Sequence, residues 1–189
     1  MKVILASASP RRRELLKVIV PDFEIAPSRN IDEPYPGDLR SDEVPVYLSA
    51  LKSAAYADIL DDGDILVTAD TVVILGERIL GKPSGRDEAI EMLSDLSGHT
   101  HRVVTGVTLA AKGRQPVSFK ATTEVTFAPL SMSDIEYYVD NYRPFDKAGA
   151  YGIQEWIGAA AVEKISGSYY NVVGLPLHAL FERLKEFGV

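Results

Sequence analysis

The stretch that decides the fold is HRVVTGVTLAAKGRQPVSFKATTEVTF, residues 101–127. It opens with a β-rich run that ends at Ala111, and the following "KGRQP" is typical of a turn. Every second residue from Val117 to Phe127 is apolar or threonine, which predicts a half-buried strand antiparallel to the one before the turn. The stretch therefore predicts a long β-hairpin.

Helices and strands alternate on both sides of this hairpin. Apolar runs predict strands at 3–6, 23–28, 64–75 and 159–165, and helical periodicity predicts helices at 10–20, 46–60, 86–97 and 175–187. Ser133 and Glu136 have the spacing of a capping box for a further helix that ends at Tyr142. The segments 29–45, 76–85, 143–158 and 166–174 are predicted to be loops or turns. Helices mixed with a long hairpin favour an α/β fold with a mixed sheet.

The composition is that of an ordinary globular protein. The chain has 189 residues, of which 46% are hydrophobic and 25% charged, so we expect one large domain or two closely joined lobes. No apolar run approaches the ~20 residues of a membrane helix, and no signal peptide is evident, so a cytoplasmic location without membrane contact is expected. The absence of cysteine excludes disulfides and thiolate metal sites.

The net charge of −7 argues against general binding of nucleic acid. A phosphate ligand would need a local basic site or a divalent cation. The segment LASASPRRRELL, residues 5–16, offers such a site. Ser9 and Pro10 suit the N-cap and first position of a helix, but arginines 11–13 then stand at the positive end of the helix dipole. They are either solvated or part of an anion site, since free backbone N–H groups and guanidinium groups both bind phosphate.

Asp70 is a second unusual residue, because it interrupts the strand-like run ILVTADTVVIL at 65–75. A buried carboxylate needs a partner, a metal or an altered pKa. One interpretation is a strand-end aspartate that Thr68 or Thr71 hydrogen-bonds. The other is a carboxylate held on a rigid strand as a metal ligand or general base.

Other polar residues have ordinary explanations. Asp32 and Glu33 fit a solvated loop, and Lys52 fits a helix face from which its side chain extends to water. Lys82 lies in a turn, and the neighbours Asp146 and Lys147 suit a simple ion pair. His99 and His101 without a third ligand make a weak case for zinc.

Taken together, the motifs resemble those of the Maf family of nucleoside triphosphate pyrophosphatases. The resemblance spans nearly the whole chain and rests on nine segments in order: LASASPRRRELL, Asp32-Glu33, LSALKSA, TADTVV, LGKP, AIEMLSDLSGHTHRVVTGV, TEVTF, DKAGAYGIQ and GSYYNVVGLPL. It implies a single Maf-like domain over residues 1–189, with two α/β lobes around a deep cleft and a long twisted mixed sheet. It also implies hydrolysis of a nucleoside triphosphate to the monophosphate and pyrophosphate with a divalent cation, Mg²⁺ or Mn²⁺. A cytoplasmic homodimer is expected.

The resemblance also implies roles for individual residues. Asp70 matches the catalytic proton acceptor, and Glu33 is expected to share a metal ion with it. Positions associated with substrate choice are matched by Arg11, Thr71 and Gln154. Polar residues that line the family's cleft are matched by Arg12, Glu33, Lys52 and Lys82, whereas Arg13 falls on a variable position and is expected to be a solvated surface charge.

Gln154 in "DKAGAYGIQ" resembles the branch that acts on dTTP and UTP, whereas the branch that acts on 7-methyl-GTP tends to have glutamate there. The two alternatives to a dTTP/UTP enzyme are that second branch and a non-catalytic nucleotide-binding regulator of cell division. Two positions depart from the family pattern: Arg143-Pro144 replaces a common Glu-Pro, and Glu155-Trp156 follows the glutamine where glycine is common. Both departures alter the loop near the presumed nucleobase site.

Overall fold

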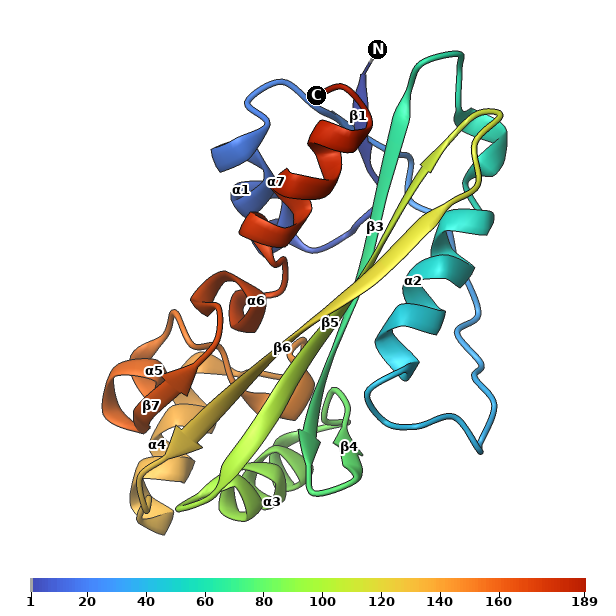
Figure 1. Ribbon diagram of the computed structural model, residues 1–189. Coiled ribbons are helices and arrows are strands. Elements are labelled where there is room, and N and C mark those ends of the chain that lie inside the picture. Colours follow the sequence, from blue (N-terminus) through green and yellow to red (C-terminus); the bar gives the residue numbers. More distant parts are fainter. Residues whose placement is uncertain (1) are drawn as a thin grey trace. The chain divides into compact units, whose positions relative to one another are not determined.

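The computed structural model describes residues 2–189 and contains a seven-stranded mixed sheet (Figure 1). The strand order is β2-β1-β3-β5-β6-β7, with β4 paired to β3. Strand β1 runs parallel to β2 and β3, whereas the β3–β4 and β6–β7 pairs are antiparallel. This confirms the predicted α/β fold with a mixed sheet. The strands are β1 (Val3–Leu5), β2 (Glu24–Ile25), β3 (Ile65–Leu75), β4 (Arg78–Leu80), β5 (Thr100–Ala111), β6 (Val117–Phe127) and β7 (Val162–Ser166).

The predicted hairpin is formed by β5 and β6, which are neighbours in the sheet and are joined by residues 112–116. A connection this short cannot carry a parallel crossover, so the two strands are antiparallel. The alternating pattern of β6 is clearest in its second half, where Thr123, Val125 and Phe127 are buried.

Seven α-helices and two 3₁₀ turns complete the described chain. They are α1 (Pro10–Ile19), α2 (Val44–Ala54), η1 (Ala57–Ile59), α3 (Arg86–Leu96), α4 (Met132–Tyr142), η2 (Ala148–Ala150), α5 (Trp156–Ala160), α6 (Tyr169–Val173) and α7 (Leu177–Glu186). Four expectations were wrong: the helix predicted at 46–60 ends at Ala54, β4 and α6 form where only turns were predicted, and α5 forms where a loop and the start of a strand were predicted. Elements β4, α5 and α6 were missed because they are short and carry no periodic signal of their own.

The cap of α4 and the face of α7 also differ from expectation. Ser131 and Asp134 form the capping box of α4, two residues before the predicted Ser133 and Glu136. The predicted pair was therefore wrong: a capping box is present, but Ser131 is the N-cap and the helix begins at Met132. On α7, the periodicity of the sequence predicts a buried face of Leu177, Leu180, Phe181 and Leu184. The three leucines are buried, whereas Phe181 is exposed and contacts Lys185.

The chain divides into two compact units. The first consists of the chain up to Thr71 together with Thr105–Ala121 and Gly174–Val189, and the second of Val72–Val104 and Thr122–Val173. Strands β3, β5 and β6 each contribute residues to both units. A single domain over residues 1–189 stays a prediction, and each unit is described below by itself.

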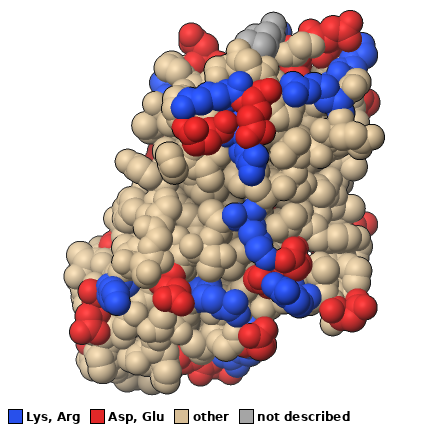
Figure 2. All heavy atoms as spheres, viewed as in Figure 1, with Lys and Arg blue, Asp and Glu red and all other residues tan. Residues whose placement is uncertain are grey.

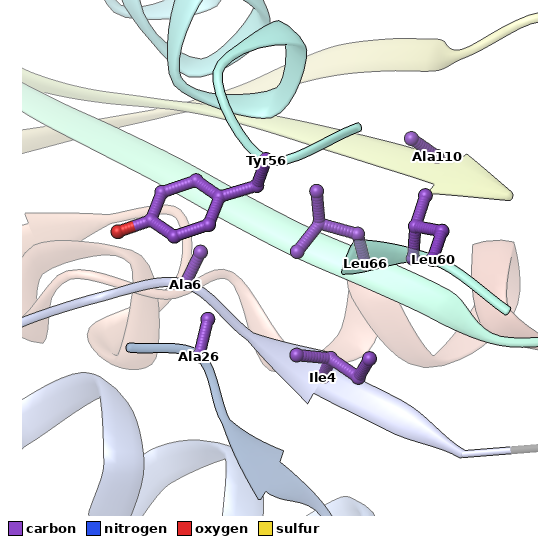
Figure 3. Close-up of a cluster of buried hydrophobic side chains, with 7 residues drawn as sticks. All are labelled: Ile4, Ala6, Ala26, Tyr56, Leu60, Leu66 and Ala110. Carbon is purple, nitrogen blue, oxygen red and sulfur yellow. The ribbon is translucent and has the colours of Figure 1, made fainter. Parts of the chain in front are cut away.

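In the first unit, a buried apolar cluster lies between β1, β3 and the segment that follows α2 (Figure 3). The Tyr56 ring lies over Ala6 and Ala26, and its hydroxyl donates to the Pro27 carbonyl at 3.0 Å. This packing is the reason that α2 ends early, because the chain must turn to bury Tyr56. Helices α1 and α7 contact each other in the same unit (Figure 1).

Helix α2 contacts the strands of the first unit through hydroxyl groups. Thr68 Oγ1 donates to the Ser49 carbonyl at 2.7 Å, and Ser49 Oγ lies 2.8 Å from Thr108 Oγ1. Gly106 permits this close approach, since a Cβ atom there would lie 2.3 Å from the backbone of Pro45. Directional bonds therefore fix where α2 lies on the sheet.

In the second unit, His101 belongs to a buried aromatic cluster. Its Nε2 lies 2.7 Å from the Tyr151 hydroxyl, and its ring meets Phe127 edge to face. Burial lowers the pKa of His101 to about 4. His99 is exposed, and the residues from 2 to 189 contain no group of three or more histidine, aspartate or glutamate residues that could hold a metal ion.

The buried histidine predicts acid sensitivity. The unfolded chain binds a proton at His101 below a pKa of 6.5, but the folded chain does so only near pH 4. The contribution of neutral His101 to the free energy of unfolding is therefore fully present above pH 6.5. The free energy of unfolding should fall by about 3 kcal/mol as the pH drops from 6.5 to about 4. We expect urea unfolding to show this loss in the wild type and a smaller loss in His101→Phe/Tyr151→Phe, which cannot titrate there. Equal pH dependence of both proteins would contradict the assignment.

The surface carries charges of both signs. On the face shown in Figure 2, Lys and Arg side chains lie among Asp and Glu side chains and form no continuous basic surface. Hydrogen bonds from Arg40 and Lys120 hold the pKa of Asp42 below its ordinary range, and Arg86 pairs with Asp140 at 2.7 Å. Among the helices of residues 2–189, none has the length and apolar character needed to cross a membrane.

Candidate active site

Asp70 lies in the middle of β3, just beyond the carboxyl end of the neighbouring parallel strand β1 in the first unit. Strand β1 pairs with β3 as far as Leu5 and Val67, and β3 then continues through Asp70. The chain that leaves β1 turns directly into α1, whose N-terminus is therefore at the same end of the strands. Ligands of α/β proteins commonly bind at such an end, and helix N-termini favour anions.

A lysine joins the two acidic residues of this site. Lys52 Nζ, on α2, lies 2.7 Å from Asp70 Oδ1 and 3.0 Å from Glu33 Oε2. The side chains of Lys52 and Asp70 are 16% and 15% exposed, whereas that of Glu33 is 43% exposed. Two interpretations from the sequence were wrong. The hydrogen-bond partner of Asp70 is Lys52 and not Thr68 or Thr71, and the Lys52 side chain does not simply extend to water.

Arg12 lies close enough to Asp70 and Glu33 to feel their charges, and its guanidinium group donates to three acceptors. Its Nε binds the Gly174 carbonyl at 2.9 Å, its Nη1 the Ala69 carbonyl at 2.8 Å, and its Nη2 the Thr71 hydroxyl at 2.9 Å. Burial lowers the pKa of Arg12, and the charge of Asp70 opposes that change. Arg12 thus ties α1 to β3 and to the segment before α7.

The rest of the arginine cluster begins α1. Ser9 is the N-cap, and its hydroxyl accepts the Arg12 N–H at 3.4 Å, as the sequence predicted. Arg11 is close enough to lower the pKa of Arg12 through charge repulsion. Arg13 differs from the expected solvated charge, because Nε and Nη2 both lie 3.4 Å from the Ser7 carbonyl.

Two predicted site residues belong to the second unit. Lys82 is exposed and lines a shallow pocket with Arg78 and Glu88. Gln154 is also exposed, at a turn that the Glu155 N–H closes on the Gly152 carbonyl at 3.0 Å. The segments that carry Lys82 and Gln154 meet where the Gly149 N–H donates to the Gly81 carbonyl at 3.0 Å.

The expected Asp146–Lys147 ion pair is present, with Nζ and Oδ1 2.8 Å apart, but Lys147 also reaches Glu155 at 3.1 Å. The second oxygen of Glu155 accepts a hydrogen bond from the Tyr138 hydroxyl. Reasoning from the sequence missed Tyr138 altogether, and its only signal for Glu155 was the departure from the family pattern. The other departure, Arg143, is an exposed residue that ends α4 with a φ of 48°.

Comparison with known proteins decides the family. A family model described as Maf-like protein matches residues 2–187. The chain belongs to the Maf family. Among its curated relatives is a dTTP/UTP pyrophosphatase of Bacteroides thetaiotaomicron, 50% identical over 185 residues that cover 98% of this chain and 95% of the relative. Another is a dTTP/UTP pyrophosphatase of Porphyromonas gingivalis, 49% identical over 189 residues, with coverages of 99% and 94%.

The fold of this Maf chain is shared more widely. The Ham1 protein of Staphylococcus aureus has a TM-score of 0.58 and 19% identity, with coverages of 98% of this chain and 99% of that one. At this identity the likeness extends to the fold alone.

The acidic residues of the Maf chain fit a divalent cation. Glu33 and Asp70 already converge on one positive charge, the Lys52 ammonium. Within residues 2–189 no third histidine or carboxylate completes a metal cluster. This donor set suits Mg²⁺, which usually binds one or two carboxylates and takes its other oxygens from water and substrate phosphates.

The structure thus brings together most of the predicted site residues within the first unit of the Maf chain. There, Asp70, Glu33 and Lys52 are in direct contact, and Arg12 contacts Thr71 and repels Arg11. Lys82 and Gln154 belong to the second unit and are connected there through their backbone segments. The catalytic and binding roles of all eight residues remain predictions.

Proposed function

We propose that this Maf protein is a hydrolase that converts dTTP and UTP to the monophosphate and pyrophosphate. The observation that carries the proposal is the Asp70 carboxylate, held by Lys52 beside Glu33 where β1 ends and the chain turns into the N-terminus of α1. The relatives from Bacteroides thetaiotaomicron and Porphyromonas gingivalis, both named dTTP/UTP pyrophosphatases, support the substrate.

In the proposed mechanism, Asp70 is the proton acceptor. Water attacks the α-phosphorus, the bond to the oxygen bridging the α- and β-phosphorus breaks, pyrophosphate leaves, and Asp70 takes the proton of the water. Glu33 and Asp70 would hold Mg²⁺ or Mn²⁺, which supplies positive charge against the phosphate chain when bound. The 15% exposure of the Asp70 side chain leaves it accessible to water while β3 keeps its position fixed.

The cations of the first unit have different tasks in this proposal. Lys52 offsets part of the charge of the two carboxylates at rest and can transfer one of its three donors to a phosphate oxygen. Arg11 binds phosphate directly. Arg12 contributes its charge from a fixed position, because three of its donors already bind Gly174, Ala69 and Thr71. A charge-assisted contact of this kind contributes roughly 1.5–3 kcal/mol.

In the second unit, Lys82 offers a further ammonium group for the phosphates, and Gln154 offers the group that recognises the base. The Gln154 side chain is exposed and makes no hydrogen bond within residues 2–189. Its amide has both a donor and an acceptor, so it can pair with O4 and N3–H of uracil or thymine. Cytosine presents the opposite pattern on that edge.

The proposal is tested by measuring pyrophosphate release from UTP, dTTP, CTP, ATP, GTP and 7-methyl-GTP, with Mg²⁺, with Mn²⁺ and with EDTA. We expect UTP and dTTP to be the best substrates and EDTA to abolish turnover. A preference for 7-methyl-GTP would place the chain in the other branch of the family. No turnover of any triphosphate would overturn the proposal and favour the non-catalytic regulator.

The proposal includes a cytoplasmic homodimer. Light scattering coupled to size-exclusion chromatography gives the mass directly, and a value near 41 kDa, twice that of the 20.7 kDa chain, is expected.

A further inference from the structure

We infer that Glu155 is a positioning residue for base recognition: its carboxylate holds the turn that presents Gln154. The inference deepens the proposed function and rests on it, because Gln154 meets a base only if the protein binds nucleotides as proposed. Glu155 does not itself recognise the base, because its two carboxylate oxygens contact Tyr138 and Lys147.

The turn is closed by backbone and side-chain bonds together. The Glu155 N–H donates to the Gly152 carbonyl at 3.0 Å, so Gln154 lies within a closed loop of the chain. The Gly152 N–H donates to the Tyr138 hydroxyl at 3.0 Å, and that hydroxyl donates to Glu155. Tyr138 therefore connects both ends of the turn to α4, and Glu155 is the acceptor that orients its hydroxyl hydrogen.

Lys147 completes the attachment from the other side. Its Nζ is 3.1 Å from Glu155 Oε1, and its own side chain is only 10% exposed. The pair packs against Gly152, where an added Cβ atom would lie 3.0 Å from Lys147 Cε and 3.1 Å from Glu155 Cδ. The turn is thus held from both sides, and its first residue is in contact with the pair.

The chain before the turn is also fixed. Gly149 has a φ of 66°, and Ala150 has a φ of 56°, which is uncommon for a residue with a side chain. A Cβ atom at Gly149 would lie 2.9 Å from Val73. Because this preceding chain is fixed, the turn as a whole should stay in place when Glu155 is replaced. Only the residues next to Gln154 should become more mobile.

The chemical consequence concerns which base the amide accepts. An amide that rotates freely can present its donor or its acceptor to either uracil or cytosine, so discrimination requires a defined starting position. Glu155 supplies that position through its bonds to Tyr138 and Lys147, and Lys147 offsets part of its charge. The residue should therefore act on base selectivity and substrate binding more than on the chemical step.

The experiment compares kcat and KM for UTP and CTP in the wild type, Glu155→Ala, Glu155→Gln and Tyr138→Phe. We expect Glu155→Ala to lower the UTP-to-CTP ratio of kcat/KM about tenfold, mainly through KM for UTP, because small displacements of a binding group have effects of this size. Glu155→Gln keeps an oxygen that accepts from Tyr138 and should recover part of the ratio. Tyr138→Phe should resemble Glu155→Ala, and the double variant should lose little more.

Glu163→Ala is the matched control, because Glu163 is an exposed glutamate on β7 in the same unit. It should keep the wild-type ratio. If Glu155→Ala and Glu155→Gln both keep the wild-type ratio, or if kcat falls equally for UTP and CTP with KM unchanged, the inference is wrong. If the wild type hydrolyses no triphosphate, the proposed function fails instead. Should Glu155→Ala not fold, the Glu155→Gln and Tyr138→Phe ratios decide.

Discussion

Asp70→Asn should lower kcat for UTP hydrolysis by about 10²–10⁴, the range expected for loss of a general base. Asparagine has nearly the same shape and can still accept the Lys52 bond that Asp70 Oδ1 makes at 2.7 Å. It cannot take a proton from water, and it lacks the charge that would balance a divalent cation. Pyrophosphate release at saturating UTP measures the effect.

The control for this substitution is Asp32→Asn, which changes an exposed acid in the loop that carries Glu33. It should turn over UTP at the wild-type rate. Circular dichroism and a thermal melt should show that both variants fold. Equal turnover by Asp70→Asn and wild type would refute the role given to Asp70.

Arg12→Met should lower the free energy of unfolding by about 3 kcal/mol or more, because hydrogen bonds to charged groups contribute about 1.5–3 kcal/mol each. The variant leaves the carbonyls of Ala69 and Gly174 and the hydroxyl of Thr71 without their donor. It should also impair hydrolysis, since the same bonds hold β3 next to Asp70. Urea denaturation followed by circular dichroism measures the loss.

Two substitutions calibrate that result. Arg13→Gln breaks only the 3.4 Å contacts with Ser7 and should change stability by less than about 0.5 kcal/mol, with UTP turnover nearly unchanged. Arg12→Lys keeps the charge but lacks the planar fork that reaches three acceptors, so it should remain close to Arg12→Met. If Arg12→Met and Arg13→Gln behaved alike, the distinction between these arginines would be wrong.

The parts of the fold that could be predicted from the sequence depend on local patterns. The period of two along β6, the cap at Ser9 and the buried strand around Asp70 each follow from residues next to one another. The start of α4 was misplaced because two serines two residues apart both fit a cap. Elements such as α6 were missed because they form only against the rest of the unit.

The contacts of the candidate site could not be predicted in the same way. Lys52 reaches Asp70 from a different helix, and the partners of Glu155 lie on α4 and in the DKAG segment. The periodicity of apolar residues in a sequence gives no information about contacts between side chains on different elements. The resemblance to the Maf family singled out the residues of the site, whereas their geometry required the fold, and Arg12 shows the difference: its donors serve the protein itself.

The hydroxyl bonds beneath α2 have a mechanical consequence. An interface of smooth apolar side chains lets a helix slide along its axis, whereas Ser49 bonded to Thr68 and Thr108 resists any axial slip. Lys52 follows Ser49 by nearly one helical turn, and Asp70 follows Thr68 by two residues on the same strand. The buried hydroxyl bonds therefore set the register of the largely buried Lys52–Asp70 ion pair. The distance between its ammonium and carboxylate groups is determined by contacts one layer deeper in the protein.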